Sequence, residues 1–265
     1  MELHLNGARA IVTGGSRGIG LAVARGLVAE GARVALTARD EQRLEVAAES
    51  IRDGEADVLA IPADTTDDTS VRAMVDKVQA AWGGVDVLVN AAAQPSFAAA
   101  PPALADLTDD AVLTDFDTKV MGYLRCARAV APHMIAQGGG RIVNISGLNT
   151  RRTGSISGTV RNVAVAALTA NLADELGPHG VGVTVVHPGM VDTERTPKLV
   201  ADRAASTGLT EEEVRAGLGA TTSLRRLVTA AEVADVIVFL CSPRAVGVTG
   251  DAVGVGGGNR GAVHY

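Results

Sequence analysis

One feature constrains the fold more than any other, namely the glycine-rich stretch Thr13-Gly14-Gly15-Ser16-Arg17-Gly18-Ile19-Gly20. It lies between an apolar run at 8–13, which predicts a strand, and a pattern at 21–30 that predicts a helix. Glycines at such a junction permit a tight turn and let backbone N–H groups approach a pyrophosphate, whose charge the helix N-terminus favours. The strand–turn–helix setting therefore predicts a dinucleotide site, and a glycine turn without a ligand is the alternative.

Short apolar runs alternate with helical patterns along the rest of the chain. Such alternation predicts a parallel sheet with helices on both faces and right-handed crossovers. We expect an α/β, single-domain Rossmann-type doubly wound parallel sheet of about seven strands over residues 1–265, with a loop at 91–107 and a substrate lid insertion at 190–225. The expected strands are 8–13, 33–37, 57–61, 85–90, 141–146, 181–187 and 251–255, and the longest expected helices are 109–136 and 157–176.

Composition excludes several classes of protein. The net charge is −6 and no Lys/Arg-rich block occurs, so the sequence lacks the cationic footprint of a nucleic-acid-binding protein. It also lacks the apolar run of about 18 residues that a membrane span needs and the apolar core of a signal peptide, which predicts a cytoplasmic protein. Cys126 and Cys241 fall in apolar stretches without metal-ligand spacing, so we expect buried free thiols and no metal.

Four motifs in order resemble those of the short-chain dehydrogenase/reductase family. The stretch at 13–20 is similar to its Thr-Gly-x-x-x-Gly-x-Gly signature, 63–65 to the segment with an adenine-contacting Asp, 90–93 to its Asn-Asn-Ala-Gly loop, and 188–193 to its Pro-Gly-x-x-x-Thr segment beside the nicotinamide. The resemblance covers residues 7–258. It implies nucleotide-binding roles for Gly14, Ser16, Arg17, Gly18, Ile19, Gly20, Arg39, Asp64, Thr65, Asn90, Ala91, Ala92, Pro188, Gly189, Val191 and Thr193.

The end of the second expected strand bears on the choice of nucleotide. A site that selects NAD usually has an acidic group here for the ribose hydroxyl. This chain has Arg39 instead, and Arg17 lies in the glycine loop. Two guanidinium groups suit the additional phosphate of NADP, so we predict NADP(H) in preference to NAD(H). Two solvated surface arginines are the alternative.

The resemblance breaks at the residues that carry the family's chemistry. These are an Asn on the fourth helix, a Ser after the fifth strand and a Tyr-x-x-x-Lys on the next helix. Counting from neighbouring landmarks puts Lys119 at the Asn position, Gly147 or Ser146 at the Ser position, Gly158 at the Tyr position and Asn162 at the Lys position. Glycine has no side chain that can donate a proton, which puts the family's usual mechanism in question.

Lys119 and Asn162 look like an exchange of the family's Asn and Lys. In the family's geometry the two positions face one cavity, where burial would lower the pKa of an amine and make it a base, an acid or a nucleophile. Gly158 would leave room for substrate. Alternatively, Lys119 pairs with Asp115 or Asp117, or reaches solvent. The candidate catalytic residues are therefore Lys119, Ser146 and Asn162.

Other residues near this region are expected to have structural roles. The two tyrosines of the chain, Tyr123 and Tyr265, lie away from the helix at 157–176, and we expect Tyr123 to pack. His187 borders Pro188 and is expected to be structural as well.

Three interpretations of function remain open on sequence grounds. The first is an NADP(H)-binding enzyme that acts on a small organic carbonyl or hydroxyl substrate by non-standard chemistry of a lyase, isomerase, cyclase or hydrolase. The second is an NADPH-dependent oxidoreductase with substitute catalytic residues. The third is a non-catalytic nucleotide-binding protein or partner subunit. In each case the resemblance implies a homodimer or homotetramer formed through the helices at 109–136 and 157–176.

Overall fold

The fold is built on one parallel sheet. The structure, a computed structural model, describes residues 1–52, 54, 56–93, 101–258 and 260. Its strand order, β3-β2-β1-β4-β5-β6-β9, is that of a doubly wound sheet and confirms the predicted fold class. The strands are β1 (Arg9–Thr13), β2 (Arg33–Ala38), β3 (Val58–Pro62), β4 (Val87–Asn90), β5 (Gly140–Ile145), β6 (Val181–Pro188) and β9 (Ala252–Val255).

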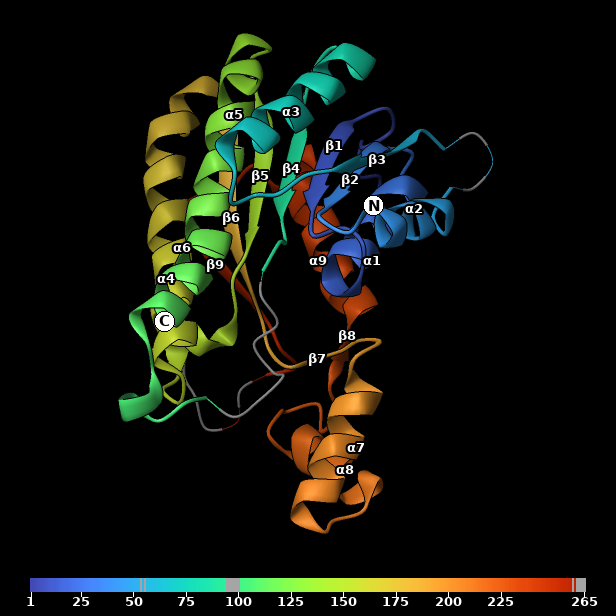
Figure 1. The fold of residues 1–265 in the computed structure, drawn as a ribbon. Coiled ribbons are helices and arrows are strands. Elements are labelled where there is room, and N and C mark those ends of the chain that lie inside the picture. The colour runs from blue at the N-terminus through green and yellow to red at the C-terminus, as the bar shows by residue number, and fades with distance from the viewer. Residues whose placement is uncertain (53, 55, 94–100, 259, 261–265) are drawn as a thin grey trace.

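Helices cover both faces of the sheet (Figure 1). One face packs on α1, α2 and α9, and the other packs on α3, α5 and α6. Both layers between helix and sheet are almost entirely aliphatic, as expected for a chain with 2% aromatic residues. The bounds are α1 (Gly18–Ala29), α2 (Glu41–Glu49), α3 (Asp68–Trp82), α5 (Gly122–Ala136), α6 (Ile156–Leu176) and α9 (Ala230–Cys241), with 3₁₀ turns η1 (Leu104–Asp106), η3 (Leu148–Arg151), η4 (Gly177–His179) and η5 (Pro243–Ala245).

The long helix predicted at 109–136 is interrupted. It consists of α4 (Asp109–Phe116), a π-helical turn η2 (Asp117–Met121) and α5. The spacing of apolar residues does not reveal a π turn, because one inserted residue hardly changes the helical periodicity. Such turns often occur at functional sites, and this one carries Lys119 into the interior, where the residue is only 4% exposed.

The insertion predicted at 190–225 forms a separate helical pair. Helices α7 (Thr196–Thr207) and α8 (Glu211–Ala220) project beyond the sheet (Figure 1) and share a small core of Val200, Val214 and Leu218. A two-stranded parallel ribbon of β7 (Val191–Asp192) and β8 (Val228–Thr229) joins the two ends of the insertion. The pair is therefore tied to the rest of the fold at its base.

The carboxyl ends of the strands define where a ligand can bind. Strand β1 lies between β2 and β4, so the direction of winding reverses there, and ligands of open α/β sheets bind at such a switch point. Part of the loop predicted at 91–107, residues 94–100, lies outside the described residues. In the described ranges, no helix has both the length and the apolarity to cross a membrane.

Candidate nucleotide and catalytic site

The glycine loop after β1 closes tightly on the loop after β4. Gly14 has φ +65°, a conformation that favours glycine, and a Cβ there would lie 2.8 Å from the carbonyl oxygen of Ala91. A Cβ on Gly20 would collide with the carbonyl oxygen of Gly14. The backbone therefore requires glycine at both positions, as the resemblance implies.

Helix α1 begins with its first N–H groups free of a side-chain cap. Arg17 is the N-cap residue in an extended conformation, and within the described chain its side chain makes no capping bond. Helices α2, α3, α6 and α9 are capped by the side chains of Asp40, Asp67, Ser155 and Thr229, whereas α5 and α7 lack a side-chain cap as α1 does. Uncapped N–H groups and the positive end of the helix dipole at the switch point fit the phosphates of a dinucleotide.

Thr13 organises the loop that follows β4. Its Oγ1 accepts hydrogen bonds from the backbone N–H groups of Ala91 (3.0 Å) and Ala92 (3.2 Å). Asn90 is fully buried and donates through Nδ2 to Oδ1 of Asn144 at 2.9 Å, so its side chain ties β4 to β5. Sequence reasoning did not assign a role to Thr13, although it is the first residue of the glycine signature.

Two further segments predicted to meet the nucleotide lie at the same edge. Oδ1 of Asp64 accepts from the backbone N–H and from Oγ1 of Thr66, which fixes the turn after β3. The methyl group of Thr193 lies 4.0 Å from where a Cβ on Gly18 would be. The start of the 190–225 insertion is therefore beside the glycine loop, as the resemblance implies.

The end of β2 is positively charged. Arg39 follows the strand and is exposed, and the neighbouring acid, Asp40, is committed to capping α2 and to an ion pair with Arg43 at 3.3 Å. Partial burial and the guanidinium groups of Arg195 and Arg43 lower the pKa of Arg17, so these cations lie near one another. An anionic group at this position would relieve their mutual repulsion.

Lys119 lies in the interior and bridges β5 to α6. Its Nζ donates to the backbone carbonyl of Ser146 at 3.0 Å and to Oδ1 of Asn162 at 2.9 Å. The alternative in which Lys119 pairs with a nearby aspartate or reaches solvent is wrong, because Asp115 pairs with Arg161 and Asp117 pairs with Arg125. The exchanged lysine and asparagine do face each other.

The surroundings of Lys119 favour its neutral form. Burial, and to a smaller extent the Arg161 guanidinium, lower the pKa of Lys119 to about 7, while Asp115 acts in the opposite direction. Hydrogen bonding gives the same result, since a neutral amine has two N–H donors and the structure provides two acceptors. An ammonium group would have a third N–H to satisfy, and the amine is therefore poised to exchange a proton near neutral pH.

The neighbouring backbone is shaped around Asn162. Oγ of Ser146 donates to the backbone carbonyl of Asn162 at 3.0 Å, which commits this hydroxyl to α6. A Cβ on Gly147 would lie 2.9 Å from Nδ2 of Asn162, closer than real side chains approach. Asn162 in its present position therefore requires glycine at 147.

Ser155 lies directly beside Gly158. A Cβ on Gly158 would lie 2.8 Å from Oγ of Ser155, whose side chain caps α6 by accepting from the N–H of Gly158. Tyr123 packs as expected, since it is 1% exposed and its hydroxyl donates to the carbonyl of Ile145 at 2.9 Å, and Tyr265 lies outside the described residues.

Arg161 and His187 are buried polar residues near Lys119, and neither was predicted as part of the site. Arg161 and Ser157 both contact the carboxylate of Asp115, which joins α6 to α4. His187 is 2% exposed, and burial together with the charges of Arg151 and Lys119 lowers its pKa to about 4. The imidazole is therefore neutral near pH 7, in keeping with the structural role expected for it.

The two cysteines are buried, as expected. Cys126 and Cys241 are free thiols, and burial raises the pKa of Cys126 to about 12, which keeps it protonated and unreactive. Among the residues with defined positions, no three His, Cys, Asp or Glu side chains are grouped so that they could hold a metal ion.

Comparison with known proteins agrees with this geometry. The family model described as enoyl-(acyl carrier protein) reductase matches residues 14–260. The chain is 34% identical to short-chain reductase protein NovJ of Streptomyces niveus, over 94% of this chain and 92% of that protein. It is also 34% identical to sorbitol dehydrogenase of Cereibacter sphaeroides, over 97% of this chain and 99% of that enzyme.

A solved structure matches the whole fold. The crystal structure of L-sorbose reductase from Gluconobacter frateurii, complexed with NADPH and L-sorbose, superposes with a TM-score of 0.93 at 29% sequence identity. The match covers 99% of this chain and 100% of the reductase chain. The matches thus extend over nearly the full length of both chains, and the structural match includes the whole fold.

Proposed function

Because this chain belongs to the short-chain dehydrogenase/reductase family, we propose that it is an NADP(H)-dependent oxidoreductase in which Lys119 handles the proton. The substrate class is small organic carbonyl and hydroxyl compounds. One observation carries the proposal: an amine with a pKa of about 7 is held between β5 and α6, beside an intact nucleotide end. A group with a pKa near the working pH is the most effective general acid or base.

The proton chemistry follows from the hydrogen bonds of Lys119. In its protonated form two N–H groups remain on Ser146 and Asn162, and the third can donate to a substrate oxygen as negative charge develops on it. In the reverse direction the neutral amine accepts the proton of a substrate hydroxyl. NADP(H), when bound, would supply or accept the hydride, and Lys119 would then provide one proton for each carbonyl reduced.

The nucleotide end supports the choice of cofactor. The glycine contacts at Gly14 and Gly20 and the uncapped start of α1 fit a pyrophosphate. We propose that Arg17 and Arg39 contact the 2′-phosphate of NADP(H), which makes this the preferred nucleotide. The neighbouring acid, Asp40, caps α2 and pairs with Arg43, so it is not free to bind the ribose hydroxyl of NAD(H). Asp64 and Thr65 would lie beside the adenine, and the segment 188–193 beside the nicotinamide.

The other two interpretations are less well supported. The named relatives are a reductase and a dehydrogenase, and this favours an oxidoreductase over a lyase, isomerase, cyclase or hydrolase. A non-catalytic subunit does not account for a buried amine with a depressed pKa, since burying an ionisable group without a function costs stability.

We further propose that residues 1–265 act as one domain, that 190–225 is the substrate lid, and that two copies pair through α4 and α6. Leu113 on α4 and Ile156, Val160 and Val163 on α6 are between 46% and 63% exposed. The three α6 residues recur at a spacing of three or four, so they form one apolar stripe along the helix. An apolar stripe of this kind is typical of a helix that packs against a second subunit.

The test is a fluorescence titration with NADPH and NADH, followed by an assay of NADPH absorbance with a panel of carbonyl compounds. We expect tighter binding of NADPH and turnover of at least one compound. Lys119→Met should lower kcat by about 10²–10⁴-fold, whereas Lys77→Met, at an exposed position on α3, should not change it. Full activity in Lys119→Met would refute the role of the amine, and tight NADPH binding without any turnover would favour the two other interpretations.

A further inference from the structure

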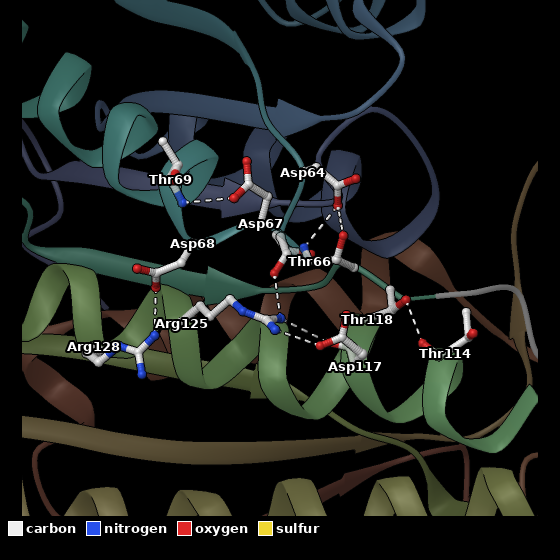
Figure 2. A network of polar contacts seen from close by, with 11 residues as sticks. Asp64, Thr66, Asp67, Asp68, Thr69, Thr114, Asp117, Thr118, Arg125 and Arg128 are labelled. Atoms are coloured by element: carbon white, nitrogen blue, oxygen red, sulfur yellow. Dashed lines mark hydrogen bonds and ion pairs between the residues drawn. The ribbon is translucent and has the colours of Figure 1, made fainter. Parts of the chain in front are cut away.

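One guanidinium group on α5 connects two segments of the proposed site. Nη1 of Arg125 donates to the backbone carbonyl of Thr65 at 3.2 Å and to that of Asp117 at 3.5 Å, and its Nη2 donates to Oδ1 of Asp117 at 2.7 Å. Figure 2 shows this side chain between the loop after β3 and the turn η2. The arginine side chain is 16% exposed, so these contacts are largely shielded from water.

The loop at 64–66, on one side of Arg125, is otherwise held by hydrogen bonds between residues close to it in sequence. Oδ1 of Asp64 holds Thr66, and the N–H of Asp64 donates to Oγ of Ser70 at 3.0 Å. A Cβ on Gly122 would lie 3.1 Å from Oγ1 of Thr65, so α5 approaches this loop closely at its first residue. Arg125 thus connects an already ordered loop to the start of α5.

The turn on the other side carries Lys119. A π turn lacks the regular hydrogen bonding of an α-helix and needs additional contacts to persist. In η2 these contacts lie before Lys119: Oγ1 of Thr118 donates to the carbonyl of Thr114 at 2.9 Å, and Asp117 is held by Arg125 through both its carboxylate and its carbonyl. Because Asp117 is only two residues before Lys119, a shift of Asp117 moves the amine.

We infer that Arg125 is a positioning residue, which fixes the loop at 64–66 and the turn that presents Lys119 relative to each other. This inference deepens the proposed function and rests on it, because the loop at 64–66 is the segment proposed to contact the adenine. It follows that the affinity for nucleotide and the titration of Lys119 depend on the same side chain, although Arg125 touches neither the substrate nor the amine.

The effect of moving the Lys119 amine can be distinguished from the effect of removing a nearby charge. The groups that face the amine are Asp115 from α4, Arg161 from α6 and His187 from β6, and the first two set the charge contribution to its pKa. Arg125 is not among the charges that shift this pKa. Arg125→Lys keeps the positive charge at this place, so a change in the titration of Lys119 that Arg125→Met and Arg125→Lys share reports a change of position.

The same helix offers a matched control. Arg128 lies three residues further along α5, and its Nη2 donates to Oδ1 of Asp68 at 2.6 Å, which links α5 to α3 (Figure 2). It is likewise an arginine that pairs with an aspartate of another element, but it contacts neither Thr65 nor η2. Arg128→Met therefore removes an arginine–aspartate pair from the same helix, at a more exposed position (52% against 16% for the two arginine side chains), without affecting the two segments that Arg125 connects.

The experiment measures the two properties separately. The chain has three lysines, Lys77, Lys119 and Lys198, so a protein labelled with ¹³C at lysine Cε gives three signals, and Lys119→Met assigns the one of interest. The first readout is the pH titration of this signal in the protein without nucleotide. The second is the dissociation constant of NADP⁺ by calorimetry, which requires no turnover.

We expect Arg125→Met to raise the pKa of Lys119 by about one pH unit and to weaken NADP⁺ binding about tenfold, the size of effect typical for a lost charge-assisted hydrogen bond. Arg128→Met should leave both readouts within twofold of the wild type. Arg125→Lys keeps the charge but has one nitrogen in place of two, so it should recover only part of the affinity. Circular dichroism checks that each variant folds, and Asp117→Asn tests the same link from the other side if Arg125→Met does not fold.

The outcomes separate this inference from the proposed function. If Arg125→Met and Arg128→Met behave alike in both readouts, or if neither changes the titration of Lys119, Arg125 is only a structural ion pair and the inference fails. If the wild type binds no NADP⁺ while Arg125→Met still shifts the titration of Lys119, the positioning role stands and the proposed cofactor is wrong.

Discussion

Replacing Lys119 by methionine should change the pH dependence of stability in a way that is specific to this side chain. The pKa of the amine falls from 10.5 to about 7 on folding, mainly through burial. At about 1.4 kcal/mol for each unit, holding the ammonium form in the fold costs on the order of 5 kcal/mol. Methionine has a similar length and no charge, so Lys119→Met removes this cost and leaves the acceptors Ser146 and Asn162 without a donor.

The sign of the effect follows from proton binding. Between pH 7 and 10.5 the unfolded chain keeps the lysine proton that the folded protein has released, so the unfolded state binds more protons and stability rises with pH. Below pH 7 both states are protonated and the wild type bears the full cost. From pH 7 to 9 the free energy of unfolding of the wild type should therefore increase by about 2 kcal/mol relative to that of Lys119→Met.

Urea unfolding at pH 6, 7, 8 and 9 measures this difference directly. Taking the difference between the two proteins cancels groups that they share, such as the buried thiols of Cys126 and Cys241. Lys198→Met is the control, because Lys198 is 81% exposed, pairs with Asp202 on the surface and should give a curve parallel to the wild type. If the curves of the wild type and Lys119→Met are parallel as well, the amine titrates normally and the proposed proton chemistry loses its basis.

Three further predictions concern the proposed activity and assembly. The kcat/KM for carbonyl reduction should fall about tenfold for each pH unit above 7, as the ammonium form of Lys119 is lost, and a profile that stays flat to pH 9 would exclude it as the acid. The double variant Arg17→Gln/Arg39→Gln should weaken NADPH binding by about tenfold or more while NADH binding changes little, and calorimetry with both nucleotides checks this selectivity. Val160→Glu with Val163→Glu should yield a monomer by light scattering, whereas an unchanged mass would place the subunit contact elsewhere.

The fold was predictable because its signals are local and repeated. Buried parallel strands appear in the sequence as short aliphatic runs, and glycines at the β1–α1 junction mark a backbone approach that no other residue allows. The predicted strands differ from the observed ones mainly at their ends. The ribbon of β7 and β8 was not predicted, because each strand has only two residues and no pattern can show in so short a segment.

The catalytic end was predictable only in part. Counting along helices from neighbouring landmarks located Lys119 and Asn162, and the family resemblance implied that the two positions face each other, as they do in the structure. It did not reveal the partners that decide the chemistry. The pairing of Asp115 with Arg161, the capping of α6 by Ser155 and the π turn that contains Lys119 depend on local geometry, which the spacing of residues does not specify.

The residues at the catalytic end depend on one another, and this argues against the non-catalytic interpretation. Lys119 orients Asn162, and the amide of Asn162 occupies the space that any side chain at Gly147 would need. A serine restored at 147 would displace Asn162, leave the buried amine with one acceptor in place of two, and thereby cost stability without returning a proton donor. Ser155 fills the corresponding space at Gly158. The glycines, the asparagine and the lysine thus form one interlocking arrangement around an amine whose pKa is lowered by burial.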